Sequence, residues 1–146
     1  MGRLGTGGVH APAAPRSSAA RCSAGTAARR ALRSEVSMLV AVEGDELVGF
    51  TACGSSRDAD AGRDTGEVRT LFVAAGRWGG GVGRKLMAAA FEDLSEGGYR
   101  KVTVWSFAAN ERANRFYEAQ GFVRDGSVRT EDAWAHIPEH RYVRLL

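Results

Sequence analysis

Residues 66–96 read GEVRTLFVAAGRWGGGVGRKLMAAAFEDLSE, a β-prone run followed by a glycine-rich turn and an amphipathic segment. The first eight residues predict a strand, in which strict alternation places Glu67 on the same face as Leu71. After the glycine-rich turn at 74–83, apolar residues recur at helical spacing over 84–96. We therefore expect a strand that passes through a tight turn directly into a helix.

Similar patterns on both sides of this unit predict the rest of the fold. Two apolar runs, 38–42 and 47–53, are joined at Gly44-Asp45, which is typical of a tight hairpin. Downstream, Asn110 is placed to cap a helix. The other predicted elements are a strand at 101–107, a helix at 111–120, and strands near 122–129 and 141–145. The order β-β-β-α-β-α-β-β predicts an α+β fold, in which helices flank a mixed, mostly antiparallel central sheet.

The chain has 146 residues, and its charge is unevenly distributed. Residues 1–34 are low in complexity and contain six Arg and no acidic residue. Because this segment has little apolar bulk to bury, we expect a disordered tail there and a single domain over 35–146. We also expect a short helix over 27–37 to lead into the domain. Acidic residues slightly outnumber basic ones in the predicted domain, which argues against a nucleic-acid-binding face.

Composition also argues against a membrane protein and against a metal-dependent protein. The longest uninterrupted apolar run, 38–42, is far shorter than the ~18 residues of a membrane span. Cys22 and Cys53 form no motif typical of a zinc site or a disulfide framework, and the three His residues are scattered. We expect a cytoplasmic protein that contacts neither membrane nor nucleic acid and needs no metal.

The glycine-rich turn is a candidate anion site. Glycines allow the backbone to approach a ligand closely, and the first turn of the following helix presents unpaired N–H groups. The spacing Gly79-x-Gly81-x-Gly83 does not fit a dinucleotide fingerprint, and no Lys followed by Ser or Thr completes a P-loop. A flexible loop with a well-capped helix is the alternative interpretation.

Two motifs resemble those of the GCN5-related N-acetyltransferase (GNAT) superfamily. The turn is similar to that family's acyl-CoA pyrophosphate loop, Q/R-x-x-G-x-G/A: Gly81 and Gly83 fit, whereas Trp78 stands at the Gln/Arg position and Arg77 lies one residue earlier. The second motif follows the family's fifth strand and reads Asn110-x-x-Ala113-x-x-Phe116-Tyr117-Glu118-x-x-Gly121-Phe122. The resemblance spans about residues 38–146. The strand and helices with which family members begin are not evident in residues 1–35.

The resemblance implies a GNAT-like sheet with two strands splayed apart at an acyl-CoA cleft, and acetyl-CoA as the cosubstrate. The pantetheine arm would bond to the main chain of the strand over 66–73, and the pyrophosphate would bind main-chain amides of the glycine-rich turn. The cofactor-binding residues implied are Leu71, Phe72, Val73, Arg77, Gly79, Gly81, Val82, Gly83, Arg84 and Asn110.

The resemblance also implies two catalytic residues. Tyr117 would donate a proton or hydrogen bond to the departing sulfur of CoA, and Glu67 would take a proton from the attacking amine, with Tyr142 and His140 as alternatives. A main-chain N–H of Val73 or Phe72 would polarise the thioester carbonyl. The implied reaction is direct attack by a primary amine of a small molecule or peptide in a ternary complex. A non-catalytic acyl-CoA-binding or interaction module is the alternative. The protein is also a candidate homodimer.

Overall fold

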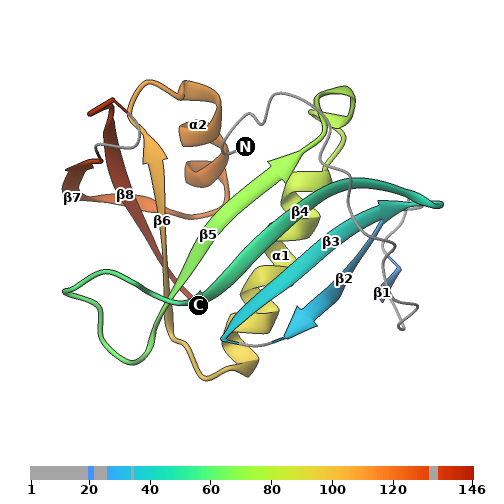
Figure 1. The fold of residues 1–146 in the computed structure, drawn as a ribbon, viewed down its shortest axis with the longest axis horizontal. Helices are drawn as coiled ribbons and strands as arrows, with labels where there is room; N and C mark the ends of the chain where they lie inside the picture. Colours follow the sequence, from blue (N-terminus) through green and yellow to red (C-terminus); the bar gives the residue numbers. More distant parts are fainter. Residues whose placement is uncertain (1–19, 22–25, 34, 132–134) are drawn as a thin grey trace.

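The computed structural model describes residues 20–21, 26–33, 35–131 and 135–146, which form one mixed sheet with helices (Figure 1). In the described residues the sheet has eight strands in the order β1-β2-β3-β4-β5-β6-β8-β7. The β5–β6 pair is parallel, and the other neighbouring pairs are antiparallel. The strands are β1 (Ala20–Arg21), β2 (Thr26–Arg33), β3 (Val36–Glu43), β4 (Glu46–Ser55), β5 (Thr65–Val73), β6 (Lys101–Phe107), β7 (Val123–Thr130) and β8 (Pro138–Leu145).

The helices are a 3₁₀ turn, η1 (Ala75–Arg77), and two α-helices, α1 (Val82–Glu96) and α2 (Glu111–Ala119). Helix α1 lies across β3, β4 and β5 (Figure 1). Its apolar stripe and the inner face of α2 enter one buried cluster with side chains from β3, β4, β5, β6 and β8. The α+β architecture predicted from the sequence is confirmed. In the described part of the chain, neither helix is long and apolar enough to cross a membrane.

The N-terminal expectations need correction. The helix predicted over 27–37 is wrong, because Thr26–Arg33 and Val36–Glu43 are antiparallel strands that pair with each other. The sheet therefore extends ahead of the predicted domain boundary at residue 35. Residues 1–19 and 22–25 lie outside the described residues, and with them most of the predicted tail.

A β-bulge in β5 changes which side chains share a face. Ala52 of β4 pairs with Thr70, but the next residue, Cys53, pairs with Val68, so Arg69 is the extra residue. Val68 and Leu71 consequently both point into the core. The predicted alternation, which placed Glu67 on the same face as Leu71, is therefore wrong. A Cβ on the neighbouring Gly66 would meet a Leu94 side chain of α1, so Glu67 points to the opposite face.

Candidate functional site

Strands β5 and β6 separate partway along their length. Their parallel register runs from Thr65–Lys101 to Val68–Val104 and ends there, although β5 continues to Val73 and β6 to Phe107. Figure 1 shows the two strands side by side at one end and diverging toward the other. The bulge at Arg69 lies where the register ends.

Beyond the bulge, the pairing of β5 with β4 determines which main-chain groups of β5 face the separation from β6. The Ala74 N–H donates to the Val48 carbonyl at 2.9 Å, so these two residues form a hydrogen-bonded pair. In an antiparallel pair of strands, hydrogen-bonded residue pairs alternate with non-hydrogen-bonded ones. Phe72 is therefore in a bonded pair with Phe50, and its main-chain groups face β4. The main-chain groups of Leu71 and Val73 face the separation from β6. The sequence interpretation offered Val73 or Phe72 as a main-chain donor, and this register favours Val73.

The main chain of β6 is arranged in the same way. Ala108 N–H donates to the Pro138 carbonyl of β8 at 2.9 Å, so the main-chain groups of Phe107 and Trp105 alternate away from β8, toward β5. The Phe107 carbonyl accepts the Asn110 N–H at 3.0 Å. Asn110 also caps α2, because its side-chain oxygen accepts the Ala113 N–H at 3.2 Å. The predicted capping role is confirmed, and the cap fixes α2 at the end of β6.

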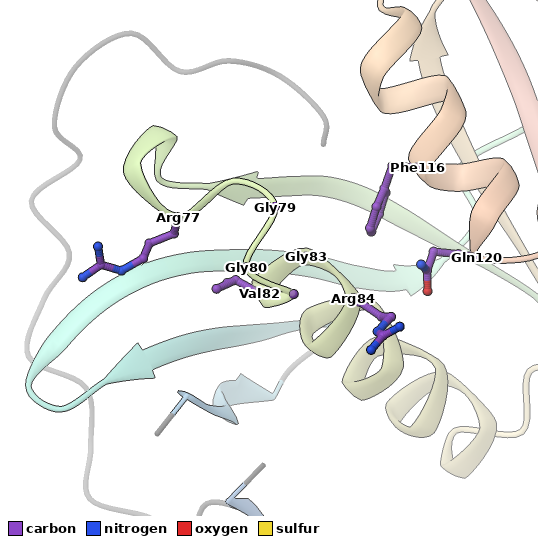
Figure 2. A pocket seen from close by; sticks show the side chains of 9 residues that line it. Arg77, Gly79, Gly80, Val82, Gly83, Arg84, Phe116 and Gln120 are labelled. Carbon is purple, nitrogen blue, oxygen red and sulfur yellow. The ribbon is translucent and has the colours of Figure 1, made fainter. Parts of the chain in front are cut away.

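The N-terminus of α1 borders a hollow of about 470 Å³ (Figure 2). The residue before the helix, Gly81, has a φ of +86°, which favours glycine. The first intrahelical bond runs from Lys85 N–H to Gly81 O at 3.1 Å, so the preceding amides have no carbonyl partner within the helix. The hollow is lined by Arg77, Gly79, Gly80, Gly81, Val82, Gly83, Arg84, Phe116 and Gln120. The glycine-rich turn thus borders a hollow with unpaired helix amides beside it, and it stays a candidate anion site.

The two arginines of this hollow differ in their availability. Arg77 donates to Glu43 at 2.9 Å and to Glu46 at 3.3 Å, so its charge is engaged by the β3–β4 hairpin. Figure 2 shows its side chain pointing away from Phe116 and Gln120. The Arg84 side chain lies on the helix and is exposed. The prediction that Arg77 binds an anionic cofactor is weakened by its ion pairs, because its donors already have acceptors.

Glu67 is a buried carboxylate held by one arginine. Its residue surface is 1% exposed. Arg57 donates to Oε1 from its backbone N–H at 3.1 Å and from Nε at 3.3 Å, and to Oε2 from Nη2 at 3.1 Å. Arg69, two residues further along β5, instead donates to the Ser55 carbonyl at 3.0 Å. A candidate proton acceptor thus has both oxygens engaged.

Tyr117 lies in an aromatic cluster. It is 2% exposed, and its ring lies 5.6 Å from Phe116, 5.8 Å from Phe122 and 6.2 Å from Tyr142. Burial raises the pKa of Tyr142 above its ordinary value, which keeps it a phenol at neutral pH and removes it as a proton acceptor. Burial and the Arg124 charge lower the pKa of His140, so that ring is neutral at pH 7.

The loop between β4 and β5 carries site residues that the sequence analysis did not identify. Trp105 Nε1–H donates to Asp58 Oδ1 at 2.9 Å, and the Arg129 guanidinium lies 4.3 Å from the Trp105 ring centre. Arg141 of β8 pairs with three carboxylates, two in this loop and one in β7. Its partners are Asp58 at 3.2 Å, Asp60 at 2.7 Å and Asp125 at 2.6 Å. The only sequence signal for this network was an acid-rich loop, which does not reveal its partners.

Metal and thiol chemistry have little support in the described residues. They contain no group of three or more His, Cys, Asp or Glu side chains that could hold a metal ion. Burial and the Asp93 carboxylate raise the pKa of the Cys53 thiol to about 12. A buried thiol of that pKa is a poor nucleophile at neutral pH. Cys22 lies outside the described residues.

Comparisons with known proteins agree with this geometry. A family model, described as the acetyltransferase (GNAT) family, matches residues 12–122. No curated protein matches the chain. An IAA acetyltransferase from Bacillus cereus is similar in structure, with a TM-score of 0.68 and 20% identity over 77% of this chain and 79% of that chain.

Two further solved structures have the same fold. A ribosomal-protein-alanine N-acetyltransferase from Brucella melitensis has a TM-score of 0.66 and 24% identity over 76% of this chain and 69% of that chain. An acetyltransferase from Bacillus subtilis in complex with CoA has a TM-score of 0.66 and 18% identity over 77% of this chain and 78% of that chain. With the family model matching most of the chain, the protein belongs to the acetyltransferase (GNAT) family and is an N-acetyltransferase.

Proposed function

We propose that this protein transfers an acetyl group from acetyl-CoA to a primary amine of a small molecule or peptide by direct attack in a ternary complex. The observation that carries the proposal is the coincidence of two features: main-chain groups of Leu71 and Val73 that face the separation from β6, and the glycine-lined hollow at the N-terminus of α1. The first suits an extended amide-bearing arm, and the second suits a diphosphate.

The two features lie in the order that CoA requires. The hollow begins at η1, directly after the end of β5, so a diphosphate there would leave the pantetheine arm to run back along Val73 and Leu71. The thioester would then lie near the bulge at Arg69. Four residues of extended strand span about 13 Å, so the Val73 N–H would contact the pantetheine arm and not the thioester, and the Val73 carbonyl already accepts Trp78 Nε1–H at 2.8 Å.

In the proposed reaction the neutral amine nitrogen forms a bond to the acetyl carbon while the carbon–sulfur bond breaks. The amine loses a proton to Glu67, directly or through water, and the departing sulfur receives a proton or hydrogen bond from Tyr117. The high pKa of the buried Cys53 supports direct transfer over an acetyl-cysteine intermediate, since its thiolate is scarce at neutral pH.

The test is release of free thiol from acetyl-CoA over a panel of amines, with wild type, Glu67→Gln and Tyr117→Phe. Each catalytic variant should lower kcat/KM by about 10²-fold or more while the Kd for acetyl-CoA stays unchanged. Glu92→Gln, an exposed carboxylate on α1, is the matched control and should behave as wild type. Failure of the wild type to bind acetyl-CoA in calorimetry would refute the proposed function.

One observation favours a second candidate, a non-catalytic acyl-CoA-binding module. Arg57 occupies both oxygens of Glu67, so the proposed proton acceptor is available only if this ion pair opens. The module would bind acetyl-CoA and release no thiol with any amine, and Glu67→Gln and Tyr117→Phe would leave its behaviour unchanged.

A further inference from the structure

Trp78 lies in the glycine-rich turn that precedes α1, and its side chain contacts both the end of β5 and helix α2. Its indole Nε1–H donates to the carbonyl of Val73 at 2.8 Å, which anchors the turn to the end of β5. The guanidinium of Arg112 lies 4.2 Å from the centre of its ring. Arg112 is in the first turn of α2, so the pair links α2 to the turn that precedes α1.

The position of Arg112 on α2 places it beside the glycine-lined hollow. Arg112, Phe116 and Gln120 are spaced four residues apart, so they share one side of the helix. Phe116 and Gln120 line the hollow, and a Cβ on Gly83 of α1 would lie 3.4 Å from the Phe116 ring. The two helices thus approach closely, and Arg112 lies one helical turn nearer to the end of β6 than Phe116.

The stack on Trp78 leaves Arg112 able to bind an anion. A guanidinium that rests on an aromatic ring uses its flat face, and its N–H donors at the edge are available. Among the described residues, no hydrogen bond or ion pair to the Arg112 guanidinium is found, whereas Arg77 is engaged by two carboxylates. Of these two arginines, Arg112 is therefore the one that no carboxylate of the described residues pairs with.

We propose that Arg112, held in place by Trp78, binds the diphosphate of acetyl-CoA from the α2 side of the hollow, opposite the amides at the N-terminus of α1. The inference rests on the proposed function, because it names a further residue for the same cosubstrate. Trp78 is then a positioning residue, and Arg112 supplies the cationic side chain that Arg77 does not. The diphosphate is favoured over the 3′-phosphate because Arg112 lies one helical turn from Phe116 of the hollow, in the direction of the separated strands.

The test measures the Kd of acetyl-CoA by calorimetry for wild type and Arg112→Ala. We expect about a tenfold increase in Kd, the loss of one charge-assisted contact at a partly exposed site. Arg112→Lys should recover part of the affinity, because lysine keeps the charge and loses the planar fork. Arg115→Ala is the matched control: the residue is an exposed arginine of the same helix that lies outside the row of Arg112, Phe116 and Gln120, so its Kd should equal that of wild type.

Two shortened forms of acetyl-CoA distinguish the diphosphate from the 3′-phosphate as the group that Arg112 binds. With 3′-dephospho-acetyl-CoA the ratio of Kd values between Arg112→Ala and wild type should stay near ten, and with S-acetylpantetheine, titrated by NMR, it should fall to one. A ratio that disappears on removing the 3′-phosphate overturns the assignment to the diphosphate. An equal loss of affinity for S-acetylpantetheine overturns the phosphate role altogether.

The role of Trp78 is tested by two substitutions. Trp78→Phe keeps a ring beneath the guanidinium and should retain most of the Arg112 effect, whereas Trp78→Leu should raise Kd several-fold and leave little further loss when Arg112→Ala is added. Thermal melts of each variant report whether it is folded. If folded Arg112→Ala binds acetyl-CoA as wild type does, the inference is wrong and the proposed function stands. If wild type does not bind acetyl-CoA, both are wrong.

Discussion

Replacing Arg57 with alanine should destabilise the fold, because it leaves a buried carboxylate short of donors. Glu67 is 1% exposed, so water has little access to replace what is removed. The backbone N–H of residue 57, at 3.1 Å from Oε1, remains in the variant. The substitution deletes the Nε and Nη2 donors at 3.3 and 3.1 Å.

The size of the destabilisation depends on how deeply Glu67 and Arg57 are each buried. A hydrogen bond to a charged group contributes about 1.5–3 kcal/mol, and two are lost. The Arg57 side chain is itself 57% exposed, so solvent screening reduces the attraction that it contributes. We expect the free energy of unfolding of Arg57→Ala to fall by about 2 kcal/mol.

Urea denaturation followed by circular dichroism measures this change. Arg57→Lys should lose about half as much, because it keeps a charge without the two-pronged geometry. The double variant with Glu67→Gln should be less destabilised than the sum of the single variants by about 1 kcal/mol or more, since the two residues interact directly. An unfolding free energy for Arg57→Ala within about 0.5 kcal/mol of wild type would refute the reasoning.

Two further predictions concern the sheet beneath the site. The pKa of the Cys53 thiol is raised from 9.0 to about 12, so its contribution to stability is complete below pH 9 and is lost as the pH rises toward 12. Denaturation at several pH values should show wild type losing up to about 1.4 kcal/mol per pH unit above pH 9 relative to Cys53→Ala, and parallel curves contradict this. A Cβ on Gly49 would lie 2.6 Å from the Phe72 carbonyl oxygen, so Gly49→Ala should cost more than about 2 kcal/mol in the same assay. Gly76→Ala, where a Cβ meets open space, should be close to neutral, and equal stability of the two variants contradicts the packing argument.

Elements whose signals are local were predictable from the sequence. The strand at 101–107 is dense in β-branched and aromatic residues, and β6 has the same bounds. The helix after Asn110 was predicted from its cap, and α2 begins at Glu111 with that cap in place. The hairpin at Gly44 needed only a glycine able to adopt a φ of +61° between two apolar runs. In each case the determining interaction lies within a few residues of the signal.

Features that depend on distant partners were not predictable in this way. Strand β2 reads TAARRALR, whose Ala and Arg residues favour a helix, and it is a strand because it pairs with β3. The bulge at Arg69 arises from the pairing of β5 with β4, and it reverses the face on which Glu67 lies. The engagement of Arg77 by the β3–β4 hairpin likewise depends on residues more than thirty positions away.

The two halves of the proposed reaction are built from different kinds of structure. The acyl-donor side uses main-chain groups of β5 and α1, whose directions follow from backbone geometry and tolerate changes of side chain. The acceptor side uses side chains: Glu67 is fixed by Arg57, and the loop that carries Arg57 is fixed by Asp58 and Asp60 on Arg141. Because each of these ion pairs can be replaced by substituting single side chains, the acceptor side can change the amine that it binds without disturbing the cosubstrate site. A fold organised in this way can keep its acyl donor while its amine specificity varies, which is why the family match identifies an acetyltransferase and the thiol-release panel is needed to identify the amine.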